Sequence, residues 1–419
     1  MTVTQASVRA SDVRVISLLS LAHGSSHFFH LILPPLFPWL KAEFAFSYAE
    51  LGLLMSVFFV VSCIVQAASG FLVDRIGARP VLFVGVGLLA LSAVVLSQSN
   101  GYGVLMLGAV IAGCGNGVFH PVDYTLINHK VSQPRLPYAY SAHGVTGYLG
   151  WAAAPVFMAG IAAWSDWRIA LLSAAVLEAA ILLLLWLHRG DLFDDVKARR
   201  TSSAEAARIA NPGLAPAGTF AFLRLTAVWL CWLFFFFSMI AMAGIQSFAP
   251  SALYQLYAIP LTTGNFSITL LALGSAAGMI LGGILAAKLK MPDRIVGTCL
   301  FVCAVLGLLI GMELATAVLI PGLFFVIGSG LGIAAPSRDM MIRSATPQGV
   351  SGSVYGIIYS GIDLGAAVGP LLFGILLDAG KPNSLFLGVA FLQILLILTA
   401  VKVVTTNATT AKVRQTTSA

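Results

Sequence analysis

Long apolar runs separated by short polar stretches dominate the pattern of hydrophobic and polar positions along the chain. A helix needs about 20 mainly apolar residues to cross the roughly 30 Å hydrocarbon core of a bilayer. Runs of about this length occur twelve times, at 16–39, 49–72, 80–98, 102–127, 138–161, 168–188, 222–248, 264–287, 294–312, 316–337, 351–377 and 384–404. The pattern therefore predicts an all-α polytopic membrane protein with twelve transmembrane helices.

One polar segment is much longer than the other connections between the apolar runs. It covers residues 189–221 and carries charges of both signs together with Ser, Pro and Gly. Such a composition is typical of a linker. The sequence thus predicts a six-helix bundle over 1–188, a cytoplasmic linker over 189–221, and a second six-helix bundle with a short cytoplasmic tail over 222–419.

An internal repeat supports this division into halves. A shift of 215 positions places seven Gly, Pro and Tyr residues of the fourth and fifth spans on identical residues of the tenth and eleventh. The pairs are Gly113/Gly328, Gly115/Gly330, Gly117/Gly332, Pro121/Pro336, Tyr140/Tyr355, Gly150/Gly365 and Pro155/Pro370. Parallel repeats of six helices are typical of one large class of secondary transporters.

Composition and charge agree with a membrane protein and set its expected orientation. Hydrophobic residues make up 59% of the chain and charged residues 9%, which is outside the range of soluble globular proteins. If both termini are cytoplasmic, the outward loops hold only Lys41, Arg168 and Lys381 of the 23 Lys and Arg residues. The positive-inside rule favours this orientation, and we expect a bacterial inner (plasma) membrane. The excess of Lys and Arg on the cytoplasmic side accounts for the net charge of +7, so no nucleic-acid partner is inferred.

A charged motif with glycines, "GFLVDRIGARPVL", follows the second span. Its key residues, called the gate motif below, are Gly70, Asp74, Arg75, Gly77 and Arg79. Anchoring by positive charge alone would explain the two arginines but not the acid or the glycines. An acid beside two bases at the cytoplasmic face can form ion pairs that break and reform when two bundles rock.

The gate motif resembles the signature between the second and third helices of the major facilitator superfamily. This resemblance implies two six-helix bundles that alternate access to a cavity lined mainly by spans one, four, seven and ten. Two stretches, "LAHGSSHFFHLILPPLFPWLKAEF" and "GCGNGVFHPVDYTLI", resemble the first and fourth helices of its fosmidomycin-resistance-like branch. Ser26 and His27 replace the Asn-Asp of that branch, and Val122 followed by Asp123 replaces its Glu, so proton antiport cannot simply be carried over.

Polar and ionisable residues inside the spans are the candidate site residues. A charged side chain at the centre of a membrane helix costs about 2.5–3.5 kcal/mol, so such residues are expected to face a polar path or a partner. The candidates for a substrate or proton path are His23, His27, His30, Asn116, His120, Asp123, His143, Gln246 and Asp363. Asp363, close to the midplane of span eleven, is the preferred carboxylate for proton coupling.

The histidines of the first span form one stripe on a helix face, and several interpretations stay open for them. Imidazole has an ordinary pKa of about 6.5, so the stripe suits proton uptake or anion binding. Alternatively, each ring satisfies a carbonyl or hydroxyl group of a neighbouring helix. A metal ion is the third interpretation. His23 and His30 are about 10 Å apart along a straight helix, too far to share one ion. His23 with His27, or His27 with His30, could share an ion. The further ligand would come from another helix, such as Asp123, Met239 or Met242.

The overall expectation is a secondary active transporter and not an enzyme. The sequence contains no recognisable nucleotide-binding loop and no nucleophile and base at a recognisable spacing. Export of a small molecule by alternating access, coupled to protons, is favoured, and proton-coupled import of an organic anion, a transition metal or a metal chelate is the alternative. We expect a monomer in the lipid bilayer with no resident metal or other cofactor.

Overall fold

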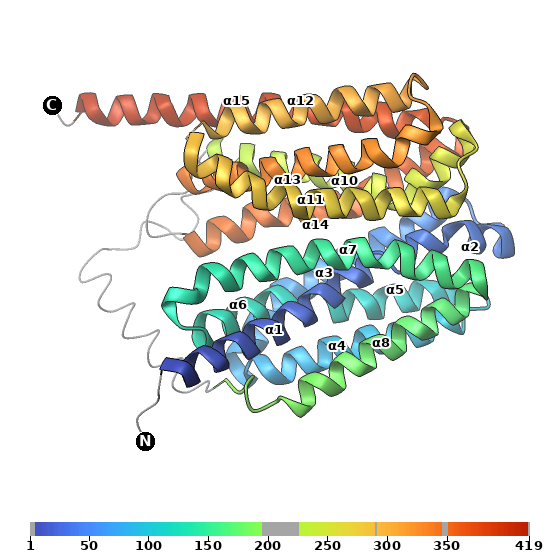
Figure 1. Ribbon diagram of the computed structural model, residues 1–419, viewed down its shortest axis with the longest axis horizontal. Coiled ribbons are helices and arrows are strands. Elements are labelled where there is room, and N and C mark those ends of the chain that lie inside the picture. The colour runs from blue at the N-terminus through green and yellow to red at the C-terminus, as the bar shows by residue number, and fades with distance from the viewer. Residues whose placement is uncertain (1–4, 195–225, 290, 346–350, 418–419) are drawn as a thin grey trace. The chain divides into compact units, whose positions relative to one another are not determined.

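Helices joined by turns and short irregular stretches form the part of the chain that the structure describes. The structure, a computed structural model, describes residues 5–194, 226–289, 291–345 and 351–417. Within these residues, twelve helical spans are long and apolar enough to cross a membrane (Figure 1). The predicted fold class is thereby confirmed. Most of the predicted linker, residues 189–221, lies outside the described residues.

The helices follow the predicted apolar runs closely. They are α1 (Gln5–His30), α2 (Phe37–Phe44), α3 (Tyr48–Ile76), α4 (Ala78–Ser97), α5 (Tyr102–Asn116), α6 (Phe119–Lys130), α7 (Leu136–Trp164), α8 (Trp167–Leu187), α10 (Thr226–Tyr257), α11 (Leu261–Leu289), α12 (Pro292–Gly311), α13 (Ile320–Ala345), α14 (Ser351–Asp378) and α15 (Asn383–Thr417). Short 3₁₀ turns precede α2, α7 and α13, at Pro34–Leu36, Gln133–Arg135 and Ala317–Leu319.

The first predicted span is not one continuous helix. Helix α1 ends at His30, a 3₁₀ turn follows at Pro34–Leu36, and α2 then begins at Phe37. Proline has no N–H to donate and disfavours helical geometry at the residue before it, so Pro34 and Pro35 end the helix. The span predicted over 16–39 is therefore present, but it is divided between two helices.

The fourth predicted span is also broken, between α5 and α6. Pro121 has no N–H to donate to the carbonyl oxygen of Gly117, four residues earlier. That oxygen instead accepts a hydrogen bond from the Ser69 hydroxyl on α3 at 3.2 Å. The break therefore starts a new helix immediately before two of the candidate site residues.

The chain forms two compact units. The first consists of Met1–Leu33 and Val60–Ala217, and the second of Pro34–Phe59 and Gly218–Ala419. In the first, α1 packs on α7, and α4 packs on α5 and α8; in the second, α10 packs on α14 and α11 on α13. Within the second unit, the Asp378 carboxylate accepts hydrogen bonds at 2.8 Å from the backbone N–H groups of Tyr48 and Ala49. The division into two six-helix bundles at the predicted boundaries stays a prediction.

Repeat-related glycines make equivalent close approaches in the two units. A Cβ on Gly150 of α7 would overlap the carbonyl oxygen of Gly24 on α1. Its repeat partner Gly365, on α14, lies in the same way against the carbonyl oxygen of Phe236 on α10. Figure 1 shows α1 and α7 side by side. The repeated glycine thus sets the same helix contact in each half.

We expect Gly150→Ala to reduce the free energy of unfolding by about 1–3 kcal/mol, the usual cost of overpacking a tight contact. The added methyl group meets backbone atoms of α1, which cannot rotate away as a side chain can. Thermal unfolding of the detergent-purified protein measures the effect. Gly160→Ala on the same helix is the matched control, because nothing lies within 4 Å of a Cβ there. Equal unfolding temperatures for the two variants would contradict this role of Gly150.

Candidate substrate site

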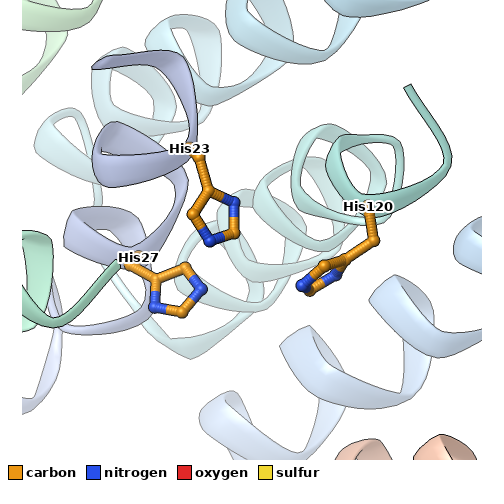
Figure 2. Close-up of side chains that lie close together, drawn as sticks. All are labelled: His23, His27 and His120. Carbon is orange, nitrogen blue, oxygen red and sulfur yellow. The ribbon is translucent and has the colours of Figure 1, made fainter. Parts of the chain in front are cut away.

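Three helices of the first unit bring five of the predicted site residues together. His23 and His27 come from α1, His120 and Asp123 from α6, and His143 from α7. We call these five residues the histidine cluster. Figure 2 shows His23, His27 and His120 with their rings pointing toward one another. Residues far apart in the sequence therefore form one polar group inside an otherwise apolar bundle.

Local features of each helix place these rings. His23 and His27 are one helical turn apart, so they share a face of α1. The break in the fourth span puts His120 in the first turn of α6. Helix α7 approaches closely because Gly147 has no side chain: a Cβ there would lie 2.9 Å from His27 Cε1 and 3.2 Å from His23 Nε2.

Asp123 is fully buried and contacts one nitrogen of each of two imidazole rings. Its Oδ2 atom is 3.1 Å from His143 Nε2, with which it forms a hydrogen bond, and 3.3 Å from His23 Nδ1. The second contact lacks hydrogen-bond geometry, and Asp123 Oδ1 has no hydrogen-bond partner. The rings of His23 and His143 stack, with centroids 3.4 Å apart and planes 20° apart. A buried carboxylate is stable only when paired, and the two imidazoles supply that pairing.

His30 lies beside the cluster, but both of its ring nitrogens are already bonded. Trp151 Nε1–H donates to His30 Nδ1 at 3.2 Å, so the ring proton is on Nε2. His30 Nε2–H then donates to Asn116 Oδ1 at 3.0 Å. The amide of Asn116 in turn donates to Ser62 Oγ at 2.8 Å. This chain of hydrogen bonds fixes one neutral tautomer of His30.

His120 differs from His30, because only one of its two ring nitrogens has a described hydrogen bond. Its Nδ1 atom lies 2.9 Å from Gln66 Oε1 on α3. A carbonyl oxygen only accepts hydrogen bonds, so Nδ1 carries the proton and Nε2 has a lone pair. The described hydrogen bonds of His120 therefore favour a ring that can accept a proton or bind a ligand through Nε2.

Gln246 and Asp363 belong to the second unit, on α10 and α14, and are not part of the histidine cluster. Three glycines of α14 contact backbone carbonyls of α10 and show that the two helices run parallel. The contacts are Gly361 with Trp232, Gly365 with Phe236, and Gly369 with Ile240. In this register Asp363 is level with residue 234 of α10, so about 18 Å of helix rise separates it from Gln246. The structure does not bring these two candidates together.

The gate motif occupies the end of α3, the turn after it and the start of α4. Gly77 has a φ of 93°, a left-handed conformation that favours glycine. Arg79 donates a hydrogen bond from Nη1 to the backbone oxygen of Arg189 at 3.0 Å, which ties α4 to the segment after α8. The Asp74 side chain lies outside the described part of the chain. Ion pairing between Asp74 and Arg75 or Arg79 therefore stays a prediction.

Several residues of the site were not identified from the sequence. Gln66 and Trp151, which orient His120 and His30, are polar or amphipathic residues in apolar spans, and that pattern could have indicated them. Glu178, on α8, is a further acidic residue inside a span. It is fully buried, and its Oε1 atom accepts a hydrogen bond from Ser25 of α1 at 3.0 Å. Its Oε2 atom has no hydrogen-bond partner.

Twelve apolar spans, an internal repeat and a buried polar cluster together define a polytopic membrane transporter. Residues 19–359 match the profile of the Major Facilitator Superfamily, and the chain belongs to this family. Membership makes it a secondary transporter of a small-molecule substrate, embedded in the lipid bilayer, and not an enzyme.

Relatives and solved structures agree with this family. The chain is 24% identical over 387 residues to the fosmidomycin resistance protein of Escherichia coli (strain K12), covering 92% of this chain and 91% of that one. It is 22% identical over 385 residues to the uncharacterized MFS-type transporter YfnC of Bacillus subtilis (strain 168), with coverage of 92% and 91%. The crystal structure of a bacterial homolog of the human lysosomal transporter Spinster shares 15% identity, with a TM-score of 0.69 over 94% of this chain and 95% of that chain. This structural likeness confirms the fold.

Proposed function

We propose that this chain exports a small molecule in exchange for protons, by alternating access. The proposal places it as a monomer in a bacterial inner membrane, with both termini cytoplasmic. The observation that carries it is the buried histidine cluster. Such a group inside a membrane bundle has a free-energy cost and is usually kept for function. The name of the Escherichia coli relative, a resistance protein, supports the outward direction.

In this proposal the histidine cluster binds the substrate. His120 Nε2 has a lone pair, and Asp123 Oδ1 and His27 Nδ1 are buried without hydrogen-bond partners. Buried polar atoms normally have partners, so unpaired ones favour a ligand that would supply them. His30 and Asn116, which are hydrogen-bonded to each other, are proposed to lie beside the substrate without binding it.

Carboxylates outside the cluster carry the protons in this proposal. Asp363 is the preferred proton carrier, because it lies about 18 Å along α14 from the start of that helix, within a span that crosses the membrane. A carboxylate whose access to water alternates can take up a proton on one side and release it on the other. Glu178 is the alternative proton carrier, since a proton on its Oε2 atom, which has no hydrogen-bond partner, would leave the hydrogen bond from Ser25 intact. The gate motif is proposed to close the cytoplasmic side.

A comparison of a strain that overproduces the chain with one that lacks it tests this proposal. The compounds to compare are antimicrobials, beginning with fosmidomycin, then organic acids and transition-metal salts. We expect overproduction to raise the inhibitory concentration of the transported compound and to lower its cellular content. A strain producing the Asp363→Asn variant at the same level is the control. Higher cellular content would instead contradict export and favour the alternative, import of an organic anion, a transition metal or a metal chelate.

A further inference from the structure

We infer that His23, His27 and His120 together bind a divalent transition-metal ion, and that such an ion is the substrate of this transporter. The transport part of this inference rests on the proposed function, whereas the binding part does not. One ring nitrogen from each of the three residues lies within 4.8 Å of one from each of the others. Figure 2 shows the three rings arranged around a common point.

The ring geometry suits a single ion. With metal–nitrogen bonds of about 2.0–2.1 Å in a tetrahedral site, the ligating nitrogens are about 3.3 Å apart and the ring centroids about 5 Å apart. The centroids of His23 and His27 are 4.5 Å apart, and those of His23 and His120 are 5.5 Å apart. The ring planes cross at 54° and 67°, so a single point can lie in the plane of each ring. Binding then requires the nitrogens to approach by up to about 1.5 Å, which side-chain rotation can supply.

The hydrogen bonds around the three rings leave suitable nitrogens for the metal. Gln66 holds the proton of His120 on Nδ1, which leaves Nε2 as the ligand. Binding through His23 Nε2 places the ring proton on Nδ1, which lies 3.3 Å from the Asp123 carboxylate. Carboxylates and carbonyl oxygens in these positions commonly orient histidine ligands of metals. His27 Nδ1 is buried and has no hydrogen-bond partner, and a metal ion would satisfy it.

Other groups of ligands in the cluster fit less well. His23, Asp123 and His143 also lie within 4.8 Å of one another. However, the rings of His23 and His143 stack with planes 20° apart, so their lone pairs cannot point to one ion. The stacking of His27 on His30, also with planes 20° apart, excludes that pair in the same way. Asp123 and His143 therefore contact His23 but are not ligands of the ion in this proposal.

A site with three histidines suits an ion that must be released. A tetrahedral metal held by three protein ligands keeps its fourth position open for water or another ligand, as in catalytic zinc sites. Closed sites with four protein ligands are structural and hold the ion permanently. Imidazole ligands favour ions such as Zn²⁺, Ni²⁺ and Cu²⁺ over Mg²⁺ and Ca²⁺. The repeat-related half has no such group, because Phe235, Met239 and Ala335 occupy the corresponding positions when Gly24 of α1 is matched to Phe236 of α10.

Cobalt binding by the purified, full-length chain in detergent, without an affinity tag, tests the site. The visible absorption of Co²⁺ reports its coordination, and displacement by Zn²⁺ gives the affinity for zinc. We expect one Co²⁺ per chain and a loss of affinity greater than about 100-fold for His27→Ala and His120→Ala. Gln66→Leu should weaken binding by about 10–100-fold, because it removes only the group that orients His120. His129→Ala, at an exposed position on α6, is the matched control and should bind as the unchanged protein does.

Two results would overturn the site: no Co²⁺ binding by the unchanged protein, or equal affinity in His27→Ala and His129→Ala. The variant His120→Asn, compared at equal unfolding temperature, separates loss of a ligand from loss of folding. Zn²⁺ flux in vesicles with an imposed pH gradient tests the transport step. Histidine-dependent Co²⁺ binding without flux of any solute would contradict the proposed function and leave the site standing. Flux of another solute without metal binding would contradict the metal site and leave the proposed transport function standing.

Discussion

Replacing Asp363 by Asn is expected to abolish solute accumulation driven by a pH gradient, down to the level of vesicles without the protein. Asn has nearly the same size as Asp and keeps hydrogen-bonding groups, so the packing of α14 on α10 should be preserved. It cannot take up or release a proton at neutral pH. Exchange of labelled for unlabelled solute needs no net proton movement and should therefore persist in the variant. Both rates are measured in the same vesicle preparation.

Asp378→Asn on the same helix is the matched control for this prediction. The two carboxylate oxygens of Asp378 each accept one backbone hydrogen bond, from Tyr48 and from Ala49, and the single side-chain oxygen of Asn can keep one of them at this exposed helix start. Accumulation should therefore survive Asp378→Asn. If Asp363→Asn vesicles accumulate solute as well as the unchanged protein does, the assignment of Asp363 as the proton carrier is wrong.

Asp123→Ala is expected to lower the free energy of unfolding by about 3 kcal/mol, at the lower end of the cost of removing one partner from a buried ion pair. Asp123 is fully buried, and its carboxylate accepts the hydrogen bond of His143 Nε2 at 3.1 Å. The alanine variant leaves this N–H group without an acceptor and also leaves a small cavity. Chemical or thermal unfolding of the purified protein measures the loss.

The comparison variant is Asp123→Asn, whose side-chain oxygen can still accept the hydrogen bond from His143. Its stability should lie between those of Asp123→Ala and the unchanged protein. Equal stability of all three proteins would show that Asp123 does not hold α6 against α7, and the described geometry of the cluster would then lack its main support.

The twelve spans could be predicted because membrane-crossing backbone must satisfy its hydrogen bonds internally, which forces long apolar helices. The breaks inside two of these spans were missed, although the prolines were visible in the sequence. Hydropathy does not distinguish a continuous helix from two short ones. In the fourth span the carbonyl oxygen freed by Pro121 is satisfied by Ser69 of another helix, a contact that only the packed structure reveals.

The candidate site could be predicted only in part. The shared face of His23 and His27 follows from helical periodicity, but which other residues join them depends on how α6 and α7 pack. Gly147 allows that approach, and nothing in its sequence context distinguishes it from the other 40 of the 41 glycines. His30 has the same spacing pattern as its neighbours, yet Trp151 and Asn116 bind both of its nitrogens. The hydrogen-bond partners therefore distinguish His30 from His23 and His27, although all three have equivalent positions in the sequence pattern.

Proton-driven export can be measured in inverted membrane vesicles from cells that overproduce the chain. The vesicle lumen is made acidic, and the compound to which overproduction confers resistance is added outside. We expect the compound to accumulate in the lumen against its concentration gradient, and a proton ionophore to abolish this accumulation. Accumulation that is unchanged by the ionophore, or equilibration of the compound without accumulation, would show that the chain is not a proton-driven exporter.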